Sequence, residues 1–218
     1  MDLHENLKGK TVVITGGSGI LCREFAYAYA KQGMNVAVLG RTLSKLEEVR
    51  DKINELGGNG LAVVCDVVDK DSVINAKKVV NDTFGKVDIL VNGAGGNHPK
   101  GTTTKEYFEK GDIENPNVVS FFDLSKENFN YVFDLNIVGT LIPTQVFIVD
   151  MLDNPGANVL NIASMSSYHA ITKVSAYCAA KAAISNLPNG LPYILQKVVS
   201  ESTLLHRAGL KQYRIKHF

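Results

Sequence analysis

The sequence predicts an α/β fold, a doubly wound parallel sheet whose two faces are covered by helices. Two observations support this fold class. Apolar runs rich in β-branched residues alternate with stretches of helical composition between residues 11 and 162. The apolar runs are continuous rather than alternating with polar residues, which is typical of strands buried on both faces. Short strands joined by helices in this way favour parallel pairing with crossover connections.

Five apolar runs are expected to be strands, and five further stretches are expected to be helices. The first run, Thr11–Thr15, is β-branched throughout. The stretch Thr42–Leu56 has its apolar residues on one stripe of a helix and stops at Gly57 and Gly58. The expected strands are 11–15, 35–39, 61–65, 87–91 and 159–162, and the expected helices are 22–32, 42–56, 72–84, 125–144 and 176–184.

The composition is that of an ordinary globular protein. The chain has 218 residues, 45% hydrophobic and 21% charged, which is enough for one sizeable core. The net charge of +1 disfavours nucleic acid as a partner. No apolar run approaches the roughly 20 residues of a membrane span, and the N-terminus lacks the apolar segment of a secretory signal. We therefore expect a small-molecule partner, with neither nucleic acid nor membrane bound.

The three cysteines indicate a reducing compartment. Cys22, Cys65 and Cys178 are odd in number and lack the spacing of a metal site. We therefore expect a cytoplasmic protein that holds no metal.

A glycine cluster follows the first expected strand. Gly16, Gly17 and Gly19 stand between that strand and a helical stretch, which is the context of a dinucleotide-binding loop. Glycines there let the backbone approach a pyrophosphate, whose charge lies at the helix N-terminus. The alternative is that these glycines only form a loop.

A tyrosine, a lysine and a serine near residue 170 suggest proton transfer. Tyr177 and Lys181 are four residues apart on an Ala-rich helix and are therefore neighbours. A free tyrosine has a pKa of about 10, and a nearby ammonium favours the phenolate. Ser164 stands at the end of the fifth strand, where a hydroxyl could polarise a carbonyl. Taken alone, the Tyr–Lys pair is more often a surface contact.

Together these motifs resemble the short-chain dehydrogenase/reductase family over roughly residues 7–186. The resemblance implies a Rossmann-type fold and an NAD(P)-dependent oxidoreductase. It makes Tyr177 the general acid/base, while Lys181 stabilises its phenolate and binds the nicotinamide ribose, and Ser164 polarises the substrate oxygen. Asn136, in D-L-N-I-V-G-T, matches the catalytic Asn-x-x-Gly of the family. We expect it in a buried turn, holding a water that links Lys181 to solvent.

The resemblance also implies a set of cofactor contacts. Two motifs depart from the family pattern, because Ile20 and Cys22 replace later glycines of T-G-x-x-x-G-x-G and Gly93 replaces an asparagine of N-N-A-G. Arg41 favours NADP(H) over NAD(H), unless it only caps the following turn. Asp66 is expected to bind the adenine amino group, or to act as a cap. The full set of expected contacts is Gly16, Gly17, Ser18, Gly19, Ile20, Arg41, Asp66, Val67, Asn92, Ala94, Gly95, Tyr177 and Lys181.

The segment 96–123 has no periodicity and is expected to be a substrate loop. It is longer than most connections and leaves the carboxyl end of the fourth strand, so a lid or binding loop is predicted. His98, Lys100 and Lys105 could meet an anionic substrate, with a solvated loop as the alternative. The loop motifs look closest to family members of the fructuronate reductase (mannonate oxidoreductase) and gluconate 5-dehydrogenase types. A steroid or acyl substrate is disfavoured by the polar loop.

The tail 187–218 does not resemble the family. Pro188, Gly190 and Pro192 stand where the helix of the family continues. Read from the third base of each codon, the tail permits T-Q-W-L-A-V-Y-F-A-K-G and then R-V-N-A-I-A-P-G-W-F-K, which resembles the family's continuation. We therefore expect residues 1–186 to form the dinucleotide-binding domain and 187–218 to be out of frame, the alternative being a divergent but selected tail.

An out-of-frame tail has structural and functional consequences. The sheet would lack its C-terminal strands, and homo-oligomers of the family kind would require an intact C-terminus. The alternative function is then that of a catalytically inactive, truncated nucleotide-binding protein.

Overall fold

The computed structural model describes residues 4–152, 154, 156–194, 202–205 and 213–214. Its sheet has the strand order β3-β2-β1-β4-β5-β6-β7. The strands are β1 (Thr11–Thr15), β2 (Asn35–Gly40), β3 (Asn59–Val64), β4 (Ile89–Asn92), β5 (Asn158–Ile162), β6 (Ser202–Leu205) and β7 (Tyr213–Arg214). The helices are α1 (Ile20–Ala30), α2 (Leu43–Glu55), α3 (Lys70–Phe84), α4 (Lys126–Phe133), α5 (Gly139–Met151) and α6 (Ser175–Ile194).

The predicted doubly wound sheet is confirmed from β1 to β5. All pairs among these strands are parallel, and β1 lies between β2 and β4. The strand order therefore reverses beside β1, and such a switch point opens a crevice at the carboxyl ends of the strands. Because the five strands are parallel, the chain leaves each of them at this edge of the sheet.

Each face of the sheet has its own apolar core. Alternate residues of β1 point to opposite faces, so that Val13 packs with α3 and α5 while Val12 and Ile14 pack with α1 and α2. Phe147 of α5 and Met34 before β2 are the largest fully buried side chains of the respective cores, apart from the strand residues. These two cores hold the strand ends in place.

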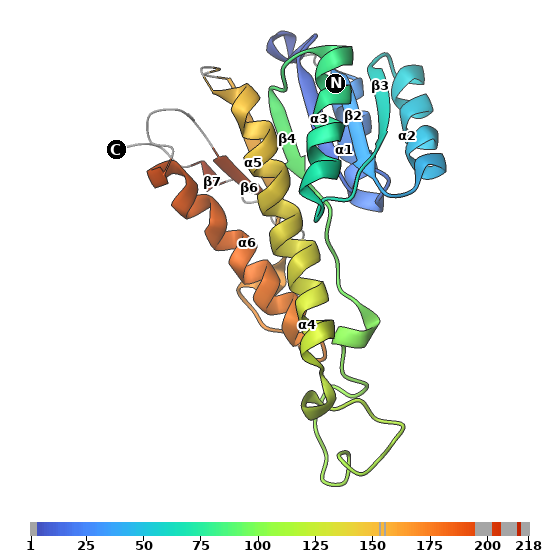
Figure 1. The fold of residues 1–218 in the computed structure, drawn as a ribbon, viewed down its shortest axis with the longest axis vertical. Coiled ribbons are helices and arrows are strands. Elements are labelled where there is room, and N and C mark those ends of the chain that lie inside the picture. The colour runs from blue at the N-terminus through green and yellow to red at the C-terminus, as the bar shows by residue number, and fades with distance from the viewer. Residues whose placement is uncertain (1–3, 153, 155, 195–201, 206–212, 215–218) are drawn as a thin grey trace.

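The helices α4 and α5 form one continuous helical run through a π-helical turn, Asp134–Val138. The run Lys126–Met151 has 26 residues, and its most apolar 18-residue window has a mean hydropathy of 1.6, so by length and composition alone it could cross a membrane. Half of its most apolar window is buried inside the protein. It packs against α3 and α6 (Figure 1). Its apolar character is therefore that of a core helix.

The tail differs from expectation in its backbone. The helix α6 continues through Pro188 and Pro192 to Ile194, although each proline removes a helical hydrogen bond. Beyond it, β6 pairs parallel to β5 and β7 pairs antiparallel to β6, each over a short segment. Joining a ladder requires only backbone donors and acceptors, which any residue except proline supplies. The rest of the tail lies outside the described residues.

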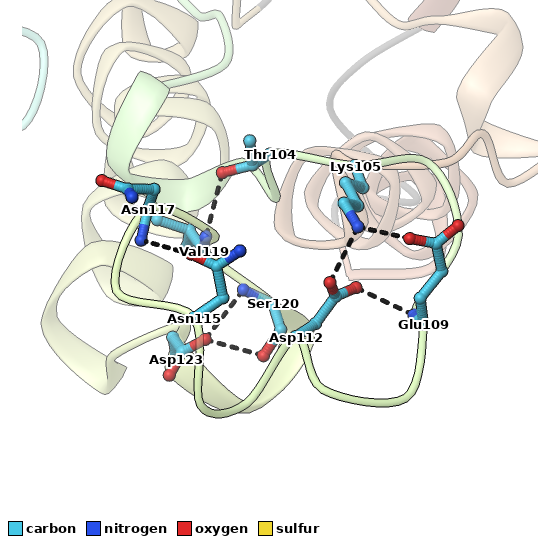
Figure 2. A network of polar contacts seen from close by, with 9 residues as sticks. All are labelled: Thr104, Lys105, Glu109, Asp112, Asn115, Asn117, Val119, Ser120 and Asp123. Atoms are coloured by element: carbon cyan, nitrogen blue, oxygen red, sulfur yellow. Dashed lines mark hydrogen bonds and ion pairs between the residues drawn. The ribbon is translucent and has the colours of Figure 1, made fainter.

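The long connection after β4 projects away from the sheet (Figure 1) and has a polar framework of its own. The buried carboxylate of Asp112 lies 2.8 Å from the Lys105 ammonium and accepts a 2.8 Å hydrogen bond from the Glu109 amide. Thr104 and Ser120 hold the other end of the loop: the Thr104 hydroxyl accepts from the Val119 amide, and the Ser120 hydroxyl donates to Asp123 (Figure 2). The loop is thus ordered by its own side chains.

Replacing Asp112 with Asn is expected to loosen this loop. The Lys105 ammonium and the Glu109 amide hold the pKa of the Asp112 carboxyl below its ordinary value. Its contribution is therefore complete above pH 4 and is lost as the pH falls through the lowered pKa. Hydrogen exchange at the Glu109 amide should be faster in Asp112→Asn at pH 7, and in the wild type it should lose protection only in acid.

The exposed carboxylate of Glu114 in the same loop provides the control. Glu114→Gln should leave exchange at the Glu109 amide unchanged. Equal exchange in Asp112→Asn and the wild type would contradict this account of the loop.

Candidate active site

A cavity of about 420 Å³ lies at the carboxyl edge of the sheet. Its walls come from the segments that follow β1, β2, β3, β4 and β5, together with α6. The residues that line it are Gly16, Ser18, Gly19, Ile20, Leu21, Cys22, Gly40, Arg41, Thr42, Lys45, Cys65, Asp66, Val67, Gly93, Ala94, Gly95, Gly96, Leu135, Ile162, Ala163, Tyr177 and Lys181.

The glycine loop fits a dinucleotide at one end of this cavity. Gly16 has a φ of 63°, and a Cβ at this position would lie 2.9 Å from the backbone of Ala94, so only glycine fits without strain. The loop is closed by the Gly19 amide, which donates to the Gly16 carbonyl. The helix α1 then begins at Ile20, so its first amides and its positive dipole end are available to an anion. The Ile20 side chain, 76% exposed, lies on the wall that a bound nucleotide would cover.

The hydroxyl of Thr15 joins the glycine loop to the loop after β4. It accepts hydrogen bonds from the amides of Gly93 and Ala94, each 3.1 Å long. It also lies 3.5 Å from the Val91 carbonyl, to which it donates. Thr15 is fully buried, so one side chain fixes both loops that form the middle of the cavity.

The end of the cavity beside β2 and β3 carries two exposed cations, Arg41 and Lys45. The helix α2 has Thr42 as its N-cap residue, with no side-chain hydrogen bond at the cap. The structure thus shows no capping contact of Arg41 at the start of this helix. The Asp66 carboxylate accepts from the Val68 amide and also lines the cavity. Burial raises the pKa of the neighbouring Cys65 thiol to about 11.

At the other end of the cavity, α6 brings Tyr177 and Lys181 together, as their spacing predicts. The Lys181 Nζ lies 5.8 Å from the centroid of the Tyr177 ring. It donates a 2.8 Å hydrogen bond to the Ile162 carbonyl at the end of β5. The lysine is buried.

Asn136 is buried in the π-helical turn between α4 and α5. Its amide nitrogen donates to the carbonyls of Gly96 and Val132, and its oxygen accepts from the Gly96 amide. A Cβ at Gly95 would lie 2.7 Å from the Asn136 side-chain oxygen and 3.3 Å from the Lys181 Nζ. The asparagine, the loop after β4 and the lysine therefore meet at one point. π-Helical turns are frequent at functional sites.

Ser164 directly follows Ala163, which is part of the cavity wall. Its hydroxyl oxygen accepts hydrogen bonds from the Ser166 amide (3.2 Å) and the Ser166 hydroxyl (2.9 Å). Ser164 and Asn136 are not among the residues that line the cavity, but each directly follows a residue that does, Ala163 and Leu135 respectively.

Most of the predicted cofactor contacts lie on the cavity wall, and two do not. A Cβ at Gly17 would lie 2.6 Å from Val38, so this glycine allows the loop to pack on β2. Asn92 is buried and donates to Thr144 and Asn161, joining β4 to α5 and β5. Both positions are therefore structural. The expected contacts did not include eleven residues of the wall, of which the cation Lys45 had a signal in the sequence: Leu21, Cys22, Gly40, Thr42, Lys45, Cys65, Gly93, Gly96, Leu135, Ile162 and Ala163.

Two of the three basic residues expected to meet a substrate are used inside the loop. Lys105 forms ion pairs with Glu109 and Asp112, and the His98 ring accepts from the Lys100 amide and packs on Tyr131. The reason is local, since a long polar loop must satisfy its own backbone and charges. Lys100 remains exposed.

A second cavity, of about 270 Å³, lies between this loop and the residues that precede α6. The Thr103 amide donates a 2.9 Å hydrogen bond to the Lys173 carbonyl there. Lys173 has a left-handed φ of 70°, which is uncommon for a residue other than glycine. The loop is therefore docked on the segment that leads to Tyr177.

Comparison with known proteins agrees with this geometry. The family description "short chain dehydrogenase" matches residues 10–196. An uncharacterized oxidoreductase of Bacillus subtilis (strain 168), UxuB, is 46% identical over 185 residues, which are 84% of this chain and 65% of that protein. An uncharacterized oxidoreductase of Haemophilus influenzae is 41% identical over 195 residues, or 89% of this chain and 68% of that protein. The chain thus spans about two thirds of the length of these relatives.

A solved structure with bound NAD is also similar. It is a protein of Haemophilus influenza, provisionally assigned as a D-mannonate oxidoreductase, with a TM-score of 0.87 and 38% identity. The match covers 92% of this chain and 71% of that one. The family description and these relatives show that the chain belongs to the short-chain dehydrogenase/reductase family.

Proposed function

We propose that the protein is an NAD(P)-dependent oxidoreductase that interconverts a carbonyl and an alcohol. One observation carries this proposal: Tyr177 and Lys181 line the same cavity as the glycine loop at the start of α1. A proton-transfer group and a nucleotide-binding end therefore share one space. The nicotinamide cofactor, when bound, would supply or accept the hydride.

The chain's own residues would manage the proton and the substrate oxygen. The Tyr177 hydroxyl would donate a proton to the oxygen in reduction and remove it in oxidation. The buried Lys181 ammonium would stabilise the phenolate, while its hydrogen bond to the Ile162 carbonyl holds it in place. The Ser164 hydroxyl would hydrogen-bond the substrate oxygen. Asn136 would fix the loop after β4 beside the lysine and support the exchange of protons with solvent.

A sugar acid of the fructuronate/mannonate or gluconate type is the proposed substrate. The Haemophilus structure, provisionally assigned as a D-mannonate oxidoreductase, supports this class. The loop Gly96–Asp123 supports it too, because it borders the residues before Tyr177. Since Lys105 is neutralised within the loop, Lys100 and Lys173 are the cations that could meet a carboxylate.

A cytoplasmic location is proposed on the state of the thiols. Cys22, Cys65 and Cys178 are buried, and none of the three forms a disulfide. A reducing compartment keeps such thiols unmodified. Assembly into a homo-oligomer of the family kind remains a proposal for a chain with an intact C-terminal region.

The proposed activity is tested with the purified protein and its Tyr177→Phe variant. We expect the wild type to bind a nicotinamide nucleotide and to turn over at least one acid in a screen of hexuronates and gluconates. Tyr177→Phe should lower kcat/KM by about 10²–10⁴-fold, because only the proton-transfer group is lost. Its nucleotide Kd should change little.

Tyr27, a half-buried residue of α1 that does not line the cavity, provides the matched control. Tyr27→Phe should keep both activity and binding. Nucleotide binding by the wild type without any turnover would favour the alternative, a catalytically inactive nucleotide-binding protein. Absence of nucleotide binding would overturn both.

A preference for NADP(H) is proposed from the cations Arg41 and Lys45, with no acidic residue at the end of β2. A 2′-phosphate would be attracted by both side chains, whereas a ribose 2′-hydroxyl gains nothing from them. Arg41→Asp should shift the ratio of Kd values toward NADH by about tenfold or more. Lys45→Ala should shift it in the same direction by less.

Fluorescence titration of both nucleotides measures this ratio. Lys52→Ala, at the far end of α2, is the control and should leave it unchanged. An unchanged ratio in Arg41→Asp would show that the site does not read the 2′-position through this residue.

We also propose that residues 187–218 are encoded out of frame. The support is the tail itself: its codons permit a run resembling the family's continuation, and two prolines stand within α6. Sequencing of the gene should find R-V-N-A-I-A-P-G encoded in another frame downstream of Asn186. A gene without this alternative frame would refute the proposal.

A further inference from the structure

The two departures from the family's sequence pattern touch each other in space. Cys22 lies in the first turn of α1 and is 4% exposed. Gly93 lies in the loop that follows β4, 71 positions later along the chain. A Cβ built on Gly93 would lie 2.1 Å from the Cys22 Sγ. The thiol therefore occupies the space that any side chain at position 93 would need.

This contact cannot be relieved by a small adjustment. A carbon and a sulfur that are not bonded normally stay more than about 3.5 Å apart. The same Cβ would also lie 2.8 Å from the Thr15 carbonyl oxygen, which belongs to the backbone and cannot rotate away. By contrast, the Cys22 Cβ would lie 3.6 Å away, an ordinary contact distance. The conflict thus comes from the sulfur atom more than from the backbone of α1.

Both residues lie where the position of the backbone matters for the site. Cys22 and Gly93 line the same cavity. The first turn of α1 is the anion-binding end of the cavity. The loop that begins at Gly93 donates two amides to Thr15 and leads to Gly96, which holds Asn136. A change in spacing between α1 and this loop would therefore move both ends of the site.

We propose that Cys22 and Gly93 are a size-matched positioning pair that sets the spacing between α1 and the loop after β4. The sulfur fills the gap left by the missing side chain at position 93, and the missing side chain makes room for the sulfur. The departure from the glycine pattern at position 22 is thus compensated at position 93. This role rests on the proposed function of the cavity as the nicotinamide nucleotide site.

A double-mutant cycle tests the pair, with nucleotide Kd and thermal unfolding measured for each protein. Gly93→Ala should weaken binding by about tenfold or more, because its methyl group meets the sulfur. Cys22→Ala leaves a void in place of the sulfur, so it should weaken binding too, but by less than Gly93→Ala. The double variant should recover most of the binding lost in Gly93→Ala, although the Thr15 carbonyl at 2.8 Å prevents full recovery.

Cys178 provides the matched control, since it is also a buried helical cysteine but lies on α6. The double variant Cys178→Ala/Gly93→Ala should bind no better than Gly93→Ala. If the wild type binds nucleotide and the effects of Cys22→Ala and Gly93→Ala on Kd are additive, the proposal of a positioning pair is wrong.

Failure of the proposed function gives a different result. In that case the wild type does not bind nucleotide. The unfolding temperatures of the four proteins in the double-mutant cycle would still show whether the two residues are in contact. Additive changes in that temperature would then overturn the pair as well. If the two substitutions are non-additive in the unfolding temperature but additive in Kd, the pair is only a packing contact, and its proposed positioning role is wrong.

Discussion

The hydroxyl of Thr15 is the interaction on which the site depends. It lies at the carboxyl end of the central strand and holds two consecutive amides of the loop after β4. Through it the glycine loop, the start of α1 and the loop that reaches Asn136 keep a common geometry. A hydroxyl that accepts two amides in the protein interior satisfies donors that would otherwise be buried without partners. The cavity is therefore built around a polar contact within an apolar core.

The sequence was sufficient for the central fold because its signals are local. Continuous β-branched runs such as Thr11–Thr15 identify buried strands, and the stripe on Thr42–Leu56 identifies an amphipathic helix. The meeting of Tyr177 with Lys181 also follows from helical spacing alone. What spacing could not show is which side chains reach the cavity. Asn92 matches a cofactor motif in sequence, yet its amide group is used to join β4 with α5 and β5.

The remaining differences come from contacts between distant parts of the chain. The contact of Cys22 with Gly93 requires α1 and the loop after β4 to be packed together, and no periodicity encodes it. The sequence suggests that Lys105 contacts a substrate, but in the structure this lysine forms an ion pair with Asp112. Pro188 and Pro192 predict a break in α6, but their cost of about 3 kcal/mol each is a local estimate that packing can offset. Tertiary contacts thus decide where local rules conflict.

The π-helical turn Asp134–Val138 determines the phase of the whole α4–α5 run. A π turn amounts to one residue inserted into an α-helix, and one residue rotates everything beyond it by about 100°. With the insertion, Val132 of α4 and Phe147 of α5 are both buried while Asn136 faces the loop after β4. Deletion of one residue here would turn Phe147 and Met151 out of their core. Evolution of this chain therefore cannot shorten the turn that carries the asparagine without turning part of α5 out of its core.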